Sequence, residues 1–593
     1  MTATNTLKPL EKSRRVIGYS RPGNGHEQGK QTEMCPSRVS TSPRGDWRVE
    51  LQPVVWLWGD NKMSQGKVLA ISAIVILGAC GGTTGSPPDS GTPDSGTPDV
   101  GDAGIVTRTV SSTLQTIYLL DDGTSVTRPG WNATLAFPDA TVAALVYADA
   151  TEASGYKVVP VTVGADSSFS VAGVPEGPYF LELDSSFGTN DQNGVGVVLK
   201  ERALIEMTTS TPDLSVVVAA RPEATFAMQP TPVQFQLSGV TPFVRGDAIK
   251  AASTDNQLNA TFTFFTPSVD VGATSIDAGV EWEAEGLPVQ AKSDVTWVFQ
   301  RGPEPLPDGG TLIDSKAFAR VTDFTVVDGR PATLKAALAA PPQGSVHADL
   351  RWSQFAALGV HPGATPAADA FSPPALLLGA TPMSVDYPKT PISVLPNQAA
   401  FIIEAEVESP KAPGTDVDYG TVTYGQPLSA PWVQNALVVY TYDVPLKDSA
   451  GATVTQINAG SYNSFVARDL LAIPLVPQIS PPVAPMVNGK DAYAFQGGVG
   501  LQPSFSWSAP SLGTANKYAL TLVPRNVAEG DTQVDLFLYD RTEVKLPPGL
   551  LETGKSYVGS ITAYSSPDRL DDPPLRTGSP THQVNTVFGL FTP

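Results

Sequence analysis

Two rows of alternating glutamates are the first candidates for chemistry in this 593-residue chain. The rows are Glu281, Glu283 and Glu285, and Glu404, Glu406 and Glu408. On a β-strand, each row would place three carboxylates on one face. A glycoside hydrolase needs two carboxyl groups at a defined separation across a cleft, whereas neighbouring strand positions are usually a solvated face. We therefore expect both rows to face solvent.

Histidine and aspartate add weak candidates for metal binding. His347, His361 and His582 are isolated in sequence, without the HExxH or His-x-His spacing of a zinc site. His347 and Asp349 could share a strand face, but an ordinary surface histidine is the simpler interpretation. The pairs Asp416/Asp418 and Asp121/Asp122 could offer oxygen ligands to calcium, yet they lack the full EF-hand pattern.

Other catalytic motifs are absent from the sequence. It contains no G-x-S-x-G elbow, and its glycine-rich runs lack the spacing of a phosphate loop. We therefore predict a non-enzymatic protein with no catalytic residue, no metal and no cofactor.

Residues 68–80, VLAISAIVILGAC, follow Lys67 and are the most informative stretch of the chain. Residues 68–77 are apolar except for Ser72. At about 1.5 Å per residue they would cross roughly half of a ~30 Å bilayer core. This length is too short for a spanning helix and suits the apolar region of a signal peptide.

The end of that stretch, Leu77-Gly78-Ala79-Cys80, resembles the lipobox of bacterial lipoproteins. The resemblance implies that the Cys80 thiol is acylated and becomes the mature N-terminus, so membrane lipid is the expected partner of Cys80. Gly81 stands where an Asp would retain an enteric lipoprotein in the inner membrane. By that resemblance, the protein is expected in the cell envelope, at the outer membrane rather than the inner one.

The segments around this signal differ in charge. Residues 1–62 hold ten Lys and Arg against six Asp and Glu, whereas the chain from Cys80 onward is strongly acidic. We expect translation to start at Met63, with 1–62 a mis-called, disordered upstream segment and 63–79 the signal peptide. Cys35 would then be lost, leaving Cys80 alone and no intramolecular disulfide. The acidic balance also argues against nucleic-acid binding.

Residues 80–104 carry the lipidated Cys and a segment with the repeat Pro-Asp-Ser-Gly-Thr. This segment has too little apolar surface to offset its ordering entropy, so we expect a disordered tether. Flexible-chain scaling gives an end-to-end distance of about 25–30 Å.

From residue 105 the composition is rich in Val, Thr, Ala, Gly and Pro, and short alternating runs recur between turn signals. This pattern predicts an all-β protein with several β-sandwich domains in tandem, and the motif resemblances of the first and last domains imply that these sandwiches are transthyretin-like or Ig-like. A body of this length exceeds one core. We predict domains at 105–222, 223–340, 341–477 and 478–593.

The first domain resembles the carboxypeptidase regulatory-like, or transthyretin-like, sandwich. The resemblance rests on a strand containing Phe169, a turn with Gly173 and Pro175, and a strand that begins with Tyr179. It implies a non-catalytic spacer or binding module.

The last domain resembles a fibronectin type III domain. Trp507 stands on an early strand, and residues 551–557, LETGKSY, match the Leu-x-x-Gly-x-x-Tyr corner. The resemblance implies that Tyr557 is buried and hydrogen-bonds the backbone near Leu551. The two middle domains match no family that we can name; they contain several strand candidates and one short helix near Trp352.

These features together favour a membrane-anchored, envelope-exposed lipoprotein that serves as a non-catalytic structural or binding module of the adhesion type. We expect a monomer whose partner is an envelope protein or a polysaccharide. The alternative is an extracellular polymer hydrolase with its catalytic residues in the middle region. Convergent carboxylates or histidines in a pocket within 223–477 would favour that alternative.

Overall fold

The computed structural model describes residues 106–120, 122–131, 141–190, 196–218, 231–253, 269–278, 295–325, 330–367, 374–381, 402–408, 414–428, 432–466, 473–565 and 582–593. It also describes short pieces at 51–52, 69–70, 222, 225–226, 283–284, 288–289 and 327. The predicted lipobox and tether, together with Trp47 and Trp56, lie outside these residues. Two short strands, β1 (Leu51–Gln52) and β2 (Leu69–Ala70), pair in parallel.

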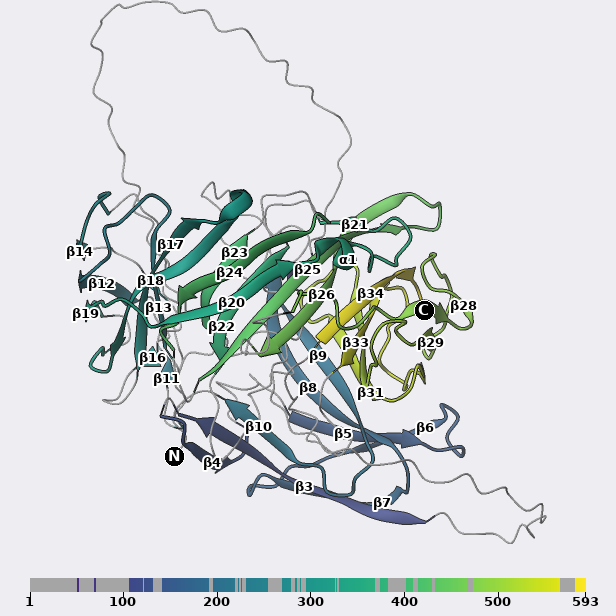
Figure 1. The fold of residues 1–593 in the computed structure, drawn as a ribbon. Helices are drawn as coiled ribbons and strands as arrows, with labels where there is room; N and C mark the ends of the chain where they lie inside the picture. Colours follow the sequence, from purple (N-terminus) through teal and green to yellow (C-terminus); the bar gives the residue numbers. More distant parts are fainter. Residues whose placement is uncertain are drawn as a thin grey trace, which may run out of the picture. The chain divides into compact units, whose positions relative to one another are not determined.

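The prediction of an all-β protein with several sheets is confirmed (Figure 1). Within the described residues the helical elements are α1 (Trp352–Ala356), close to the predicted position, and the 3-10 helix η2 (Pro307–Gly309). No helix of this part of the chain has the length and apolar character needed to cross a membrane.

Strands fill the body from its beginning to its end. The first part contains β3 (Thr107–Leu119), β4 (Ser125–Pro129), β5 (Thr141–Ala148), β6 (Tyr156–Pro160), β7 (Ser168–Pro175), β8 (Tyr179–Asn190), β9 (Gly196–Met207) and β10 (Leu214–Val218). The C-terminal part contains β27 (Val483–Val487), β28 (Lys490–Asp491), β29 (Ser504–Ser508), β30 (Lys517–Pro524), β31 (Thr532–Tyr539), β32 (Glu543–Lys545), β33 (Tyr557–Ser565) and β34 (His582–Phe591).

The middle region is equally rich in strands. It contains β11 (Thr225–Phe226), β12 (Thr231–Ser238), β13 (Ala248–Ser253), β14 (Ser275–Ala278), β15 (Glu283–Ala284), β16 (Pro288–Val289), β17 (Thr296–Pro305), β18 (Thr311–Val321), β19 (Ala332–Ala337), β20 (Gln343–Leu350), β21 (Thr365–Pro366), β22 (Ala375–Thr381), β23 (Ile402–Glu408), β24 (Val417–Gly425), β25 (Val433–Lys447) and β26 (Thr453–Val466). The Pro-rich residues near 302–307 are partly strand, because β17 continues to Pro305 past a bulge at Gln300/Arg301.

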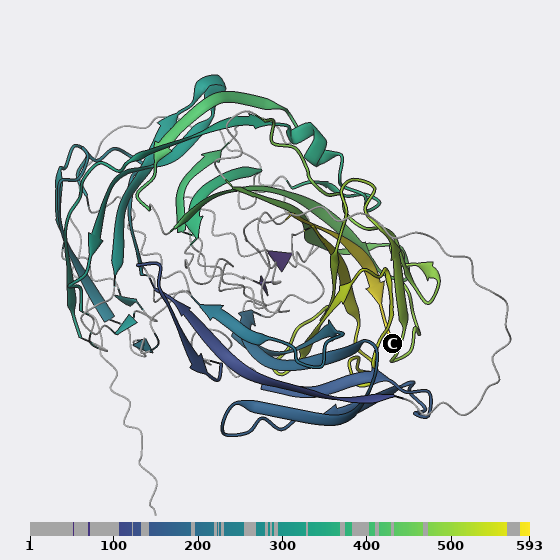
Figure 2. The same ribbon diagram turned by 60° about the horizontal axis from the view of Figure 1, so that its bottom comes forward.

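One sheet of 16 strands connects parts that are distant in sequence. Its order is β13-β17-β18-β23-β22-β25-β26-β34-β33-β30-β31-β9-β8-β5-β6, with β21 paired to β25. The link between β9 and β31 is parallel, with Leu204 opposite Leu536. Figure 2 shows these early (blue) and late (yellow) strands from a second direction. The sheet thus includes strands from all four predicted domains, whose boundaries remain predictions.

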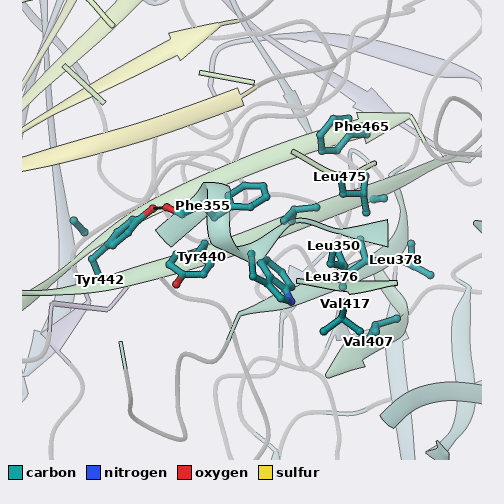
Figure 3. Packing of buried hydrophobic residues seen from close by; sticks show 14 of the residues in the cluster. Leu350, Phe355, Leu376, Leu378, Val407, Val417, Tyr440, Tyr442, Phe465 and Leu475 are labelled. Atoms are coloured by element: carbon teal, nitrogen blue, oxygen red, sulfur yellow. Dashed lines mark hydrogen bonds between the residues drawn. The ribbon is translucent and has the colours of Figure 1, made fainter. Parts of the chain in front are cut away.

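Alternating apolar positions on these strands form several hydrophobic clusters, because every second side chain of a strand points to the same face. The largest cluster joins the middle region to the last part of the chain (Figure 3). In it, Phe355 of α1 and Tyr440 and Tyr442 of β25 pack together, and the Tyr442 hydroxyl donates a hydrogen bond to the Phe355 carbonyl. This contact attaches the short helix to the sheet.

Candidate functional site

A cluster of buried ionisable side chains lies where β17, β18 and β23 meet. β17 pairs with β18, and β18 pairs with β23, so that Ile313 lies opposite Glu406. Ala405 and Val407 of β23 enter the hydrophobic core, which turns Glu404 and Glu406 to the opposite face. Glu404 is fully buried and Glu406 is 4% exposed. The expectation that this row faces solvent is therefore wrong: neighbouring strands and the backbone near Leu428 cover it.

Hydrogen bonds hold the carboxylates in place. Glu404 Oε1 accepts a hydrogen bond of 2.8 Å from the backbone N–H of Leu428. Asp314 Oδ1 accepts one of 2.7 Å from the N–H of Gly425. Ser315 Oγ donates to the Glu404 carbonyl at 2.6 Å. Two oxygens, Glu404 Oε2 and Glu406 Oε1, are buried without a hydrogen-bond partner among the residues that the structure describes.

Arg301 is the cation of this cluster. It is 3% exposed, and its guanidinium interacts electrostatically with Glu404, Glu406 and Asp314. The carboxylates outnumber Arg301, so its positive charge offsets only part of the free-energy cost of burying them. Lys250 of β13 adds a second positive group, whose pKa is lowered by burial and by Arg301.

Burial dominates the titration of these acids. It raises the pKa of Glu404 to about 8 against the opposing effects of the Leu428 N–H and Arg301. It raises the pKa of Glu406 to about 7 and that of Asp314 to about 6. Carboxyl groups with pKa values near neutrality can act as general acids when a substrate reaches them. Glu404 and Glu406 are covered, so the arrangement as it stands is a buried charge network.

Sequence reasoning found the glutamates but missed Arg301 and Asp314. The available signal was a charged residue, Arg301, that follows the mostly apolar residues 295–299 after a single glutamine, Gln300. Neither the pairing of β18 with β23 nor the approach of Leu428 could be read from the sequence, and both decide that the cluster is buried. Glu283 lies in β15, whereas Glu281 and Glu285 lie outside the described residues.

The motif residues of the first predicted domain lie on β7 and β8, so Gly173 and Pro175, which the resemblance places in the turn, belong to strand β7 and the turn follows them. Phe169 and Tyr179 are buried in one cluster, and the Tyr179 hydroxyl donates 3.0 Å to the Thr209 carbonyl. Gly173 has φ +75°, a left-handed conformation that side chains resist. Pro175 ends β7 just before the turn into β8.

The corner predicted around Tyr557 is present. Tyr557 is 1% exposed, and its hydroxyl accepts a 2.9 Å hydrogen bond from the N–H of Glu552. Trp507 is buried as well and contacts Tyr518 edge to face. Leu77, Gly78, Ala79 and Cys80 lie outside the described residues.

The remaining candidates are histidines. His361 and His582 are buried, and burial lowers the pKa of His582 to about 4. His347 is half-buried, with Nε2 3.7 Å from Asp418 Oδ1.

No family model and no curated protein matches the chain. Among solved structures, it is similar to the FN1–FN3 domains of chicken CNTN1, at 9% identity over 58% of this chain and 91% of that one, with a TM-score of 0.12. It is also similar to a tetra-tandem repeat from the extending region of a large adhesion protein, at 12% identity over 80% of this chain and 99% of that one, with a TM-score of 0.11. At these TM-scores the chains do not superpose.

Proposed function

We propose that this protein is a lipid-anchored, envelope-exposed lipoprotein whose all-β body serves as a non-catalytic structural or binding module. The observation that carries the proposal is the run from Lys67 to Cys80, in which a basic residue is followed by ten mostly apolar residues, the last of which begins Leu-Gly-Ala-Cys. A polar, Pro- and Gly-rich segment then separates Cys80 from the first strand of the body. This order suits a body held away from a membrane by a lipid.

The side chains of the body also support a structural role. The acids of the Arg301 cluster are covered: Glu404 and Asp314 accept hydrogen bonds from backbone N–H groups, and Glu406 faces Arg301. Two of the three histidines from residue 80 onward are buried. These side chains affect the stability of the fold, but they are buried and do not contact a substrate at the surface.

An envelope protein is a better match to the body than a polysaccharide. Sugars are commonly bound by exposed aromatic rings, and no aromatic side chain is exposed among the residues that the structure describes. Partner recognition would then depend on loops carried by the rigid strands.

The anchoring part of the proposal is tested by the variant Cys80→Ser. Cells are given an alkyne fatty acid, and acylation and membrane fractionation of the protein are measured. The natural protein should be labelled and sediment with membranes, whereas Cys80→Ser should lose the label and either leave the membrane or retain its signal. Ser95→Ala, in the segment that follows Cys80, is the control and should behave like the natural protein. Equal labelling of Cys80→Ser would refute the anchor.

A polymer hydrolase is the second candidate, and the convergence of Glu404, Glu406 and Asp314 in the middle region favours it. Its test is described in the Discussion.

A further inference from the structure

Three side chains of metal-binding type meet on the antiparallel pair β20–β24. Val346, Ala348 and Leu350 of β20 enter the core, which places His347 and Asp349 together on the other face. Asp349 lies opposite Asp418 of β24, whereas His347 lies opposite Thr421. The two steps from His347 to Asp349 on β20 therefore match three steps on β24. The extra residue of β24 forms a β-bulge.

The bulge brings Asp418 toward His347. On β24, Val417 and Tyr419 enter the core before the bulge, and Val422 and Tyr424 enter it after the bulge. The alternation of core-facing and outward-facing residues is therefore shifted by one position at the bulge. Gly420, at the shift, has φ +66°. Asp418 Oδ1 accepts a 2.8 Å hydrogen bond from the Gly420 N–H and lies 3.7 Å from His347 Nε2.

Asp349 supplies the observation that points to a ligand. Its side chain is only 7% exposed, and Oδ2 accepts a 2.7 Å hydrogen bond from Arg351. Oδ1 is buried and has no hydrogen-bond partner among the described residues. A buried polar atom without a partner costs about 1–3 kcal/mol, and more when it is charged. Since Arg351 takes Oδ2, Oδ1 is the oxygen available to a bound cation.

The local charge agrees with a divalent cation. Asp349, Asp416 and Asp418 contribute three negative charges, and Arg351, which also lies 3.9 Å from Asp416, contributes one positive charge. The imidazole of His347 adds a nitrogen donor. A divalent ion would balance the excess of two negative charges.

We propose that His347, Asp349 and Asp418 bind one divalent transition-metal ion, with Zn²⁺ the best fit. One potential ligand atom from each residue lies within 4.8 Å of the others. Tetrahedral ligands at about 2.1 Å from one ion lie about 3.4 Å apart, so a contraction of up to about 1.4 Å completes the site. Asp418, whose side chain is 55% exposed, is free to make that movement.

The donor set also selects the metal. Ca²⁺ and Mg²⁺ prefer oxygen ligands alone, whereas an imidazole with two carboxylates suits Zn²⁺. Three protein ligands leave a further position for water. The hydrogen bond from Gly420 to Asp418 and that from Arg351 to Asp349 would orient the two carboxylates around the ion.

The test is a calorimetric titration of the chelator-treated full-length protein with Zn²⁺ alone. The natural protein should bind one Zn²⁺ per chain at this site, and Co²⁺ in its place should give a visible absorption band. His347→Gln and Asp418→Asn should each weaken Zn²⁺ binding by at least about tenfold. Both residues are partly exposed, so the variants should keep the thermal midpoint of the metal-free protein.

Two variants serve as matched controls. Glu543→Gln and Glu152→Gln each remove one carboxylate at an exposed position away from the site; both should bind Zn²⁺ within about threefold of the natural protein. The site is refuted if Zn²⁺ does not saturate, which would mean that Asp349 Oδ1 is met by water only. It is also refuted if the two ligand variants bind like the controls, or if equimolar Ca²⁺ displaces Zn²⁺.

Discussion

The hydroxyl oxygen of Tyr557 accepts a 2.9 Å hydrogen bond from the backbone N–H of Glu552. The two residues flank a tight turn, with Gly554 at φ +86°, that leads into β33. The Tyr557 ring stacks on Phe591 with the ring centroids 5.7 Å apart. The hydrogen bond and the stacked ring together fasten the entry of β33 to the last strand of the chain.

Tyr557→Phe tests this corner. The variant keeps the ring but leaves the Glu552 N–H without its acceptor, so the free energy of unfolding should fall by about 1 kcal/mol. Chemical denaturation of the purified protein measures the change. Tyr493→Phe is the control, because its hydroxyl makes a longer contact of 3.3 Å with Thr586. A loss no larger than that of the control would contradict a stabilising role for the Tyr557 hydroxyl.

Glu404 should make the protein less stable as the pH rises. Its folded pKa of about 8 exceeds the 4.5 of an unperturbed glutamate because of burial. Between these values the folded state retains a proton that the unfolded state has released. The free energy of unfolding therefore falls with increasing pH across this window, by an amount on the order of a few kcal/mol.

Glu404→Gln tests that dependence. The amide stays neutral and its oxygen can still accept from Leu428, so the variant should match the natural protein near pH 5 and exceed it in stability at pH 8. The loss of stability between pH 5 and pH 8 should be smaller in the variant but not zero, since Glu406 and Asp314 titrate in the same range. Thermal midpoints at both pH values measure the effect. Glu543→Gln, on an exposed position of β32, should change neither midpoint. If the midpoint of Glu404→Gln falls between pH 5 and pH 8 by as much as that of Glu543→Gln, the role of Glu404 in the pH dependence is refuted.

Leu204 of β9 packs against the C-terminal strands, so its substitution tests how much this contact stabilises the protein. It is fully buried and shares a cluster with Leu520, Leu536 and Trp507 of the C-terminal part. Leu204→Ala should reduce the free energy of unfolding by about 2–5 kcal/mol, through lost burial and the cavity left behind.

Tryptophan fluorescence during urea denaturation measures this loss, because Trp507 belongs to the same cluster. Val198→Ala, on the 45%-exposed Val198 of the same strand, should cost far less. Equal effects of the two substitutions would mean that the shared cluster adds little to stability.

A hydrolase screen decides between the two proposed functions. The purified protein is incubated with peptide, ester and glycoside substrates, with and without calcium and zinc. We expect no turnover, because Glu404 and Glu406 are covered. Turnover that disappears in Glu406→Gln, Glu283→Gln or His347→Gln, and persists in Glu543→Gln, would establish the enzyme and overturn the structural role.

Local sequence was sufficient to predict the all-β class, the short helix near Trp352 and the corner around Tyr557. Strand periodicity depends on successive residues, and the hydrogen bond from Glu552 to Tyr557 spans only five positions, so these features are determined within short segments. The proposed lipobox likewise rests on a local pattern, residues 77–80, and involves no tertiary contact.

Only the tertiary structure decided which faces of the strands are covered. The row containing Glu404 and Glu406 has the same alternation whether its face meets water or protein, and it is buried because β18 and the backbone at Leu428 pack against it. Asp418 reaches His347 through a bulge in the pairing of β20 with β24. Strand register and the burial of a strand face depend on contacts between segments that are far apart in the chain. A local pattern of residues carries no information about the energies of those contacts.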